Sequence, residues 1–482
     1  MESLMLRRVR VIGDGRLVDI AIDRGHITAV GRALDPMPGA NQIDLDGRWV
    51  MPGLWDAHVH FTQWARFLAR IDVSGTSSAA EAVQRLVAAN PQDALIVGRG
   101  FQDALWPDAP TAQALDLAFP GRSVVVVSHD LHSVWLSSAA AARFGAPSAG
   151  LLREADAFAI QVALGKVAGD DTALVRAAAQ RAAARGVVGI HDLEMADNVA
   201  VWQGRVLAGL RTLRVHAGIY PEHLDASDQR GWVGGSVVPG TDGRVVVGAL
   251  KVFSDGSLNT RTALTYEPYG TDASVGHAAH SPRELANLLR EARARRLEVA
   301  LHAIGDLAVT RALDAFEASG ARGSIEHAQL IRAADLPRFA RLRIIASVQP
   351  QHAIDDREVT DAVWADRAER AFAYRHLLDA GAQLWLGSDA PVAPLDPWVT
   401  MAAAVSRTDD EQDSWHAEQE LPREAALRAS TRRLHGVWLV PGMPGDVIAM
   451  ETDPYEATAP QLRQMSVALT VVGGSVTHST LS

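Results

Sequence analysis

The stretch "SPRELANLLREARARRLEVALHAIG" (residues 281–305) joins an alanine-rich, charged pattern to a short apolar run that contains a histidine. The spacing predicts a helix over 281–296, followed at once by a buried strand over 297–305. Strands that alternate with helices of this length are typical of βαβ units and of a parallel sheet. This stretch therefore predicts an α/β fold.

The same alternation runs through the middle of the chain. Eight apolar runs have the length of a buried strand: 54–61, 186–193, 213–219, 245–255, 297–305, 323–330, 343–350 and 382–391. Eight parallel strands are the number that closes a (β/α)₈ barrel. We therefore expect an α/β, TIM-like barrel.

The two ends of the chain differ from the middle. Both consist of short apolar pieces broken by Gly and Asp, and Gly473-Gly474 separates two β-rich runs as a two-residue hairpin turn would. We expect residues 1–52 and 439–482 to form one small β-sandwich beside a barrel domain over 53–438. Two surplus apolar runs, at 93–101 and 123–130, predict a large insertion after the first barrel strand, at about 62–180 and over the barrel mouth.

Composition excludes several classes of function. The 482 residues carry a net charge of −11 with no basic cluster, which argues against a nucleic-acid partner. No run of about 18 apolar residues predicts a membrane span, and the first residues lack the apolar core of a signal peptide. We expect a cytoplasmic protein.

The absence of cysteine excludes disulfides and thiolate ligands, so any metal must be held by histidine, carboxylate or a less usual group.

Metal-ligand residue types fall at the predicted strand ends. His58 and His60 stand two apart, so their side chains point to the same side of the first strand. His302, His327 and Asp389 end three further strands, and active sites of this fold lie at the C-terminal strand ends. Singly, each of these residues is as well explained by a hydrogen-bonded rim or capping residue. Together they predict a site for Zn²⁺ or a similar divalent ion.

Lys251 stands out because the chain has 46 basic residues and only two lysines, Lys166 and Lys251. It follows an apolar run, where a buried ammonium is unfavourable. Genome composition, a snorkelling side chain or a salt bridge would each explain it. The alternative is a site that needs an amine able to lose its proton, which a guanidinium cannot do.

Five motifs resemble the amidohydrolase superfamily of metal-dependent hydrolases, in the branch of enzymes like N-substituted formamide deformylase. They are "MPGLWDAHVHF" (51–61), "LKVFSDGSL" (250–258), "LHAIGD" (301–306), "IEHAQL" (325–330) and "LGSDAPVAPLDP" (386–397). The resemblance covers nearly the whole chain. One departure is Trp55, which stands where this family usually has a smaller apolar residue. We expect Trp55 to face away from Asp56 and to leave the ligands undisturbed.

The resemblance implies a role for each matched residue. His58, His60 and Asp389 would bind the more buried of two metal ions, and His302 and His327 the other. Lys251, N6-carboxylated by carbon dioxide, would bridge the two ions.

The reaction that the resemblance implies is hydrolysis of a non-peptide carbon–nitrogen bond in a small-molecule amide, most simply a linear N-substituted amide. A metal-activated hydroxide would attack the carbonyl, with Asp389 as the general base. A cyclic-amide hydrolase, a deaminase and an inactive scaffold remain as alternatives, although deaminases of the superfamily tend to lack the bridging lysine.

His132 and His352 are candidates for substrate contacts, and a homodimer is a family-level expectation.

Overall fold

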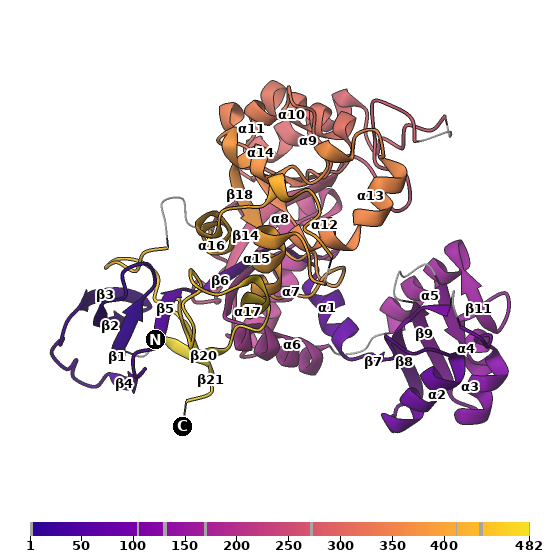
Figure 1. The fold of residues 1–482 in the computed structure, drawn as a ribbon, viewed down its shortest axis with the longest axis horizontal. Coiled ribbons are helices and arrows are strands. Elements are labelled where there is room, and N and C mark those ends of the chain that lie inside the picture. The colour runs from indigo at the N-terminus through magenta and orange to yellow at the C-terminus, as the bar shows by residue number, and fades with distance from the viewer. Residues whose placement is uncertain are drawn as a thin grey trace. The chain divides into compact units, whose positions relative to one another are not determined.

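The computed structural model describes residues 3–103, 106–128, 133–167, 171–269, 273–410, 412–432 and 437–481. The chain divides into two compact units, one of Met1–Trp64 with Arg176–Ser482 and one of Ala65–Val175. Figure 1 shows the first unit with a barrel and a separate sheet of terminal strands, and the second with a smaller sheet of its own.

The barrel is a sheet of eight parallel strands, in which neighbours in sequence order pair side by side. The strands are β6 (Leu54–Val59), β12 (Val187–Asp192), β13 (Arg214–Ile219), β14 (Val245–Phe253), β15 (Val299–Ala303), β16 (Gly323–His327), β17 (Ile345–Val348) and β18 (Gln383–Leu386). The two edges meet where Val59 forms a parallel bridge to Ala390. The sheet is therefore a nearly closed TIM-like barrel, and the eight predicted strands are confirmed.

The stretch from Ser281 to Gly305 shows why the chain alternates in this way. Helix α9 (Pro282–Ala294) begins with a capping box, in which Ser281 and Glu284 each accept a backbone hydrogen bond from the other. One face of α9 is buried, and β15, which follows it, is buried throughout. The predicted helix and strand are both confirmed.

The other helices between or after the strands follow the same alternation. They are α1 (Phe61–Leu68), α6 (Thr172–Ala184), α7 (Asn198–Leu207), α8 (Leu224–Gln229), α10 (Asp306–Ser319), α11 (Leu336–Leu342), α12 (Pro350–Asp355), α13 (Arg357–Val363), α14 (Tyr374–Asp379), α15 (Pro397–Ser406), α16 (Arg423–Ser430) and α17 (Ala459–Arg463).

Strands from both ends of the chain share one sheet, in the order β21-β20-β19-β5-β1-β2-β3, with β4 paired to β1. Their bounds are β1 (Leu4–Val11), β2 (Leu17–Asp23), β3 (His26–Gly31), β4 (Asn41–Asp44), β5 (Trp49–Pro52), β19 (Val447–Met450), β20 (Val467–Val472) and β21 (Ser475–Ser479). The antiparallel pair β5–β19 joins the two ends, and residues of both ends share one apolar core. Gly473 and Gly474 have φ of 58° and 81°, as a two-residue hairpin turn requires. The predicted β domain from both termini is confirmed.

The second unit lies between β6 and β12 in the sequence. Its sheet has the order β11-β10-β9-β8-β7, formed by β7 (Ile71–Asp72), β8 (Leu95–Phe101), β9 (Ser123–Ser128), β10 (Ser133–Leu136) and β11 (Gly150–Arg153). Its helices are α2 (Ala79–Ala88), α3 (Ala112–Ala118), α4 (Ser138–Phe144) and α5 (Glu154–Val167). A large insertion after the first barrel strand is therefore confirmed, while its place over the barrel mouth stays a prediction.

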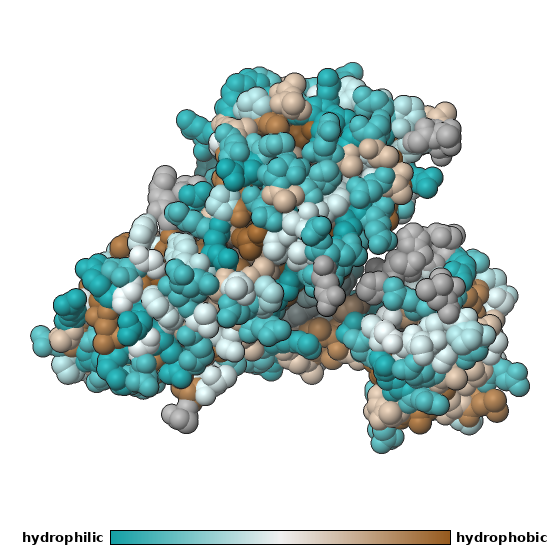
Figure 2. Space-filling model, viewed as in Figure 1, coloured by the Kyte–Doolittle hydropathy of each residue, from teal (hydrophilic) through white to brown (hydrophobic). Residues whose placement is uncertain are grey.

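Hydrophilic residues predominate on the face of the molecule shown in Figure 2, with apolar residues scattered among them. In the described ranges, no helix combines the length and the apolarity that a membrane span needs.

Gly189 of β12 makes room for the large side chain of Trp55 inside the barrel. A Cβ atom at Gly189 would lie 2.5 Å from the indole, whereas one at Gly204, in α7, would have no atom within 4 Å. We expect Gly189→Ala to lower the free energy of unfolding by about 1–3 kcal/mol through overpacking. Gly204→Ala is the matched control and should raise it by about 0.5–1 kcal/mol. Urea unfolding of both variants checks this, and equal stabilities would contradict it.

Candidate metal centre

The barrel brings the predicted ligands from five strands to the C-terminal end of the sheet. His58 lies in β6, Lys251 in β14, His302 in β15 and His327 at the end of β16, and Asp389 follows β18. These five residues are all buried, with at most 9% of any of them exposed. His60 follows β6 directly and is half-buried.

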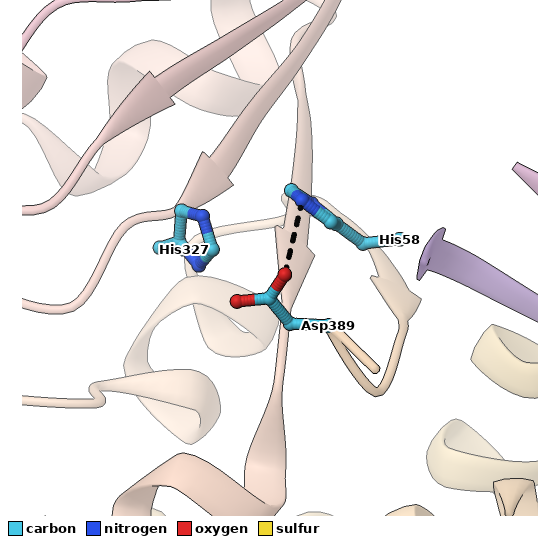
Figure 3. A group of neighbouring side chains, drawn as sticks. All are labelled: His58, His327 and Asp389. Atoms are coloured by element: carbon cyan, nitrogen blue, oxygen red, sulfur yellow. Dashed lines mark ion pairs between the residues drawn. The ribbon is translucent and has the colours of Figure 1, made fainter. Parts of the chain in front are cut away.

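Asp389 is the point on which the histidines converge. Its Oδ1 lies 3.5 Å from Nε2 of His58 and 3.5 Å from Nε2 of His60. His58, His327 and Asp389 each offer one ligand atom within 4.8 Å of the others. Figure 3 shows these three side chains pointing toward one another from separate strand ends. This spacing suits side chains that share one ion.

Several buried nitrogen atoms around Asp389 lack a hydrogen-bond partner among the described residues: His58 Nε2, His60 Nδ1, Lys251 Nζ, His327 Nδ1 and His352 Nε2. Buried polar atoms nearly always have a hydrogen-bond partner, so a group of such nitrogen atoms without one indicates a ligand site. Imidazole and carboxylate are ligands of Zn²⁺ and similar ions. The donor set therefore fits a divalent metal.

The ion-pair alternative for Lys251 finds no support, because the described residues place no carboxylate within 4 Å of Nζ. A snorkelling lysine would reach water, but only 1% of Lys251 is exposed. Its Nζ lies 5.0 Å from the ring centroid of Phe253. Burial lowers the pKa of the Lys251 ammonium below its usual value. The neutral amine, the form that reacts with carbon dioxide, is therefore more accessible here than at an exposed lysine.

His302 makes a hydrogen bond that selects its tautomer. Its Nε2 lies 3.0 Å from the carbonyl oxygen of Gly256, so this nitrogen carries the proton and donates it. Burial, followed by the nearby Lys251 charge, lowers the pKa of His302 to about 3. The ring is therefore neutral, with the lone pair on Nδ1.

Glu326 is a functional residue that the sequence interpretation missed. Its Oε2 lies 2.7 Å from Nδ1 of His58, and Ser324 donates its hydroxyl to Oε1. Burial raises the pKa of Glu326, but the hydrogen bond and charge of His58 outweigh it, so the net shift is downward. A carboxylate behind a ligating histidine fixes the tautomer and orientation of the ring. The signal was present in "IEHAQL", as a carboxylate within a buried strand.

Asp56 is a second missed residue. Its carboxylate accepts backbone N–H groups from His58 and Ser388, each at 3.0 Å. These bonds tie the end of β6 to the segment after β18, and Asp389 N donates to His58 O at 2.7 Å across the same junction. Asp56 therefore positions His58 beside Asp389.

Of the two candidate substrate residues, His352 lies beside Asp389. His352, in α12, has Nε2 3.9 Å from Oδ2 of Asp389, and its ring stacks on that of His327 at 6.2 Å between centroids. It therefore lies at the ligand cluster. His132 lies outside the described residues.

Replacing Glu326 by glutamine is expected to lower kcat/KM by about 10–100-fold, because the amide keeps the shape but loses the charge behind His58. The affinity for the metal should fall by a similar factor. Metal titration and steady-state kinetics measure both. Glu317→Gln, which changes an exposed carboxylate, is the control. Wild-type kinetics in Glu326→Gln would show that this carboxylate does not act on His58.

A TIM-like barrel with histidines, a lysine and an aspartate at its strand ends defines the class of metal-dependent hydrolases. A profile described as "Amidohydrolase family" matches residues 41–478. The chain therefore belongs to the amidohydrolase family, as the motifs predicted, and is a hydrolase acting on carbon–nitrogen bonds other than peptide bonds. This membership also supports a divalent metal.

Known proteins of similar sequence cover the chain almost end to end. A putative amidohydrolase, YtcJ of Bacillus subtilis, is 28% identical over 92% of this chain and 91% of its own. The N-substituted formamide deformylase of Arthrobacter pascens is 23% identical over 94% of both chains. An uncharacterized metal-dependent hydrolase of Pyrococcus horikoshii superposes with a TM-score of 0.83 at 25% identity, over 95% of this chain and 99% of its own.

Proposed function

We propose that the protein hydrolyses a linear, N-substituted small-molecule amide to a carboxylate and an amine. The observation that carries the proposal is the set of buried nitrogens around Asp389 that have no hydrogen-bond partner within the described ranges of the chain. The full-length similarity to a formamide deformylase supports the choice of a linear amide over a cyclic one. Formate and an amine are then the expected products.

The proposed ligands are His58, His60 and Asp389 for one Zn²⁺, with His302 and His327 for a second, and with N6-carboxylated Lys251 between them. Such ions, when bound, polarise a carbonyl and lower the pKa of water toward ~7. The nitrogen atoms without a partner in the part of the chain that the structure describes support this assignment, as do the neutral rings of His302 and His327.

Asp389 is proposed as the general base. Burial raises the pKa of its carboxyl, but the charge of His58 and the hydrogen bond from His60 outweigh it and hold the pKa well below the usual value. The carboxylate is therefore ionised at neutral pH, takes the proton of the attacking water and passes it to the leaving nitrogen. His352 is proposed to contact the substrate beside this oxygen, and its distance of 3.9 Å from Oδ2 supports that role.

Three further parts of the proposal concern the whole protein. We propose domain boundaries at 1–52, 53–438 and 439–482, a cytoplasmic location and a homodimer.

The test is a substrate panel assayed with enzyme purified without chelator and with Zn²⁺ added. It should contain N-substituted formamides, linear acetamides, cyclic amides and aminated heterocycles. Release of formate and amine from the formamides, lost on dialysis against a chelator and restored by Zn²⁺, is the expected result. Turnover confined to cyclic amides or to aminated rings would replace the proposal by the corresponding alternative. No turnover on any member would leave an inactive relative.

A further inference from the structure

A second site is indicated by a cavity of about 420 Å³ at the opposite end of the barrel. Trp55 of β6 and Val246 of β14 line it, near the N-terminal ends of their strands. Trp55 precedes His58 by three residues and Val246 precedes Lys251 by five. At about 3.3 Å per strand residue, the cavity wall lies roughly 10–17 Å from the metal ligands. It is therefore separate from the catalytic site.

The cavity wall carries more positive than negative charge. Four arginines line it, Arg24, Arg214, Arg244 and Arg432, against two carboxylates, Asp242 and Asp446. Both carboxylates are already engaged, since Arg214 binds Asp446 at 2.7 and 3.0 Å and Arg211 pairs with Asp242. Arg24 also pairs with a carboxylate, that of Asp23 at 3.7 Å. The lining is therefore rich in arginine, although at least two of its four arginines already have a carboxylate partner.

Arg244 is the residue that points most directly to an anion. Only 7% of it is exposed, Nη2 donates to Val472 O at 3.1 Å, and Nη1 has no hydrogen-bond partner among the described residues. Burial lowers the pKa of Arg244 to about 10, so the guanidinium is still charged at neutral pH. A buried, charged N–H without an acceptor is unfavourable, and an anion in the cavity would satisfy it.

Two indole rings hold Arg432 in place at the same cavity. Its guanidinium carbon lies 4.3 Å from the ring centroid of Trp385 and 4.7 Å from that of Trp55. Such stacking fixes the plane of a guanidinium and the direction of its N–H groups. Trp55, Val246 and Pro444 add an apolar part to the wall. The cavity thus combines guanidinium groups, one of them held between two indole rings, with an apolar surface.

We propose that this cavity binds the phosphate group of a small molecule through Arg244 and Arg432. Arg244 and Arg432 line one cavity, and a phosphate group has enough oxygen atoms to accept hydrogen bonds from both guanidinium groups. Guanidinium groups also match the geometry of phosphate oxygens. The volume lies within the usual range of small-molecule sites, so an organic phosphate fits beside the indole of Trp55 as well as inorganic phosphate does.

Isothermal titration calorimetry of the metal-loaded chain of 482 residues tests the proposal, at constant ionic strength set with chloride. The probes are inorganic phosphate and phenyl phosphate. We expect one saturable site per chain for at least one probe. Tighter binding of phenyl phosphate would identify an organic phosphate as the ligand, and equal binding would identify inorganic phosphate.

The variants separate this site from the metal centre and from non-specific charge effects. Arg244→Gln and Arg432→Gln should each weaken binding at least tenfold, and two variants guard against one that fails to fold. Arg341→Gln, which removes an exposed arginine paired with Glu317, should bind as the wild type does. Asp389→Asn should also keep the site. Binding that is absent, that survives both cavity variants, or that is lost only in Asp389→Asn would overturn the proposal.

Discussion

Replacing Lys251 by methionine is expected to lower kcat/KM by more than about 10³-fold, about 4 kcal/mol, without lowering the free energy of unfolding. The proposed catalytic ligand at this position is an anion formed on the amine, and methionine cannot form it. Stability should not suffer, because Nζ is buried and has no hydrogen-bond partner among the described residues. An apolar side chain of similar length removes an unsatisfied polar group. Steady-state kinetics and urea unfolding of the same preparation measure the two effects.

The opposite behaviour of activity and stability makes this variant informative. A structural lysine would lose stability on replacement, whereas a chance lysine would lose neither property. Lys166→Met, at the only other lysine in the chain, controls for general effects of removing an amine. Partial recovery of Lys251→Ala by added short carboxylic acids would support an anionic ligand at this position. Wild-type turnover in Lys251→Met would refute the bridging role.

The barrel could be predicted from the sequence because its signals are local. Each strand is a short apolar run next to a helical pattern, and the capping residues of α9 lie within four positions of one another. The fold itself brings the strand ends together, so the candidate ligands at those ends lie close to one another. The hairpin at Gly473-Gly474 is equally local, because positive φ at two successive residues favours glycine.

Glu326 and Asp56 could not be assigned in this way, because their roles depend on register between distant strands. Glu326 contacts His58 across 268 residues of sequence. The side-chain directions of His327 and Asp389 are also hard to predict, because their backbones lie in the left-handed region, with φ of 71° and 57°. Backbone of this kind turns a side chain away from the regular alternation of a strand, so sequence spacing alone does not give its direction. Such strained residues are often found at functional sites.

Trp55 shows how a departure from a family pattern can carry information. Nothing in the sequence explains a large ring at that position, and we expected only that it would leave the ligands undisturbed. In the structure its indole lies 5.2 Å from the ring of His216, where Gly189 leaves it room. The same indole stacks on Arg432 and lines the second cavity. The indole of Trp55, although it belongs to the same strand as His58, therefore packs at the other end of the barrel.

Asp389→Asn is expected to lower kcat by about 10²–10⁴-fold, the range that a positioned general base contributes. The amide has nearly the same shape and keeps one oxygen toward His58 and His60, which lie 3.5 Å away in the wild type. It cannot accept a proton at neutral pH. KM should change little if Asp389 acts mainly on the chemical step, because substrate binding does not need the base.

The comparison with Asp389→Ala separates the two roles proposed for this residue. Alanine removes the ligand as well as the base, so it should lower both turnover and the metal content measured by elemental analysis. Asparagine should lower turnover far more than metal content. Equal metal loss in the two variants would mean that the carboxylate charge chiefly holds the ion, and another group near the cluster would have to move the proton. His352, whose Nε2 lies 3.9 Å from Oδ2, is the residue whose geometry would then suit that task.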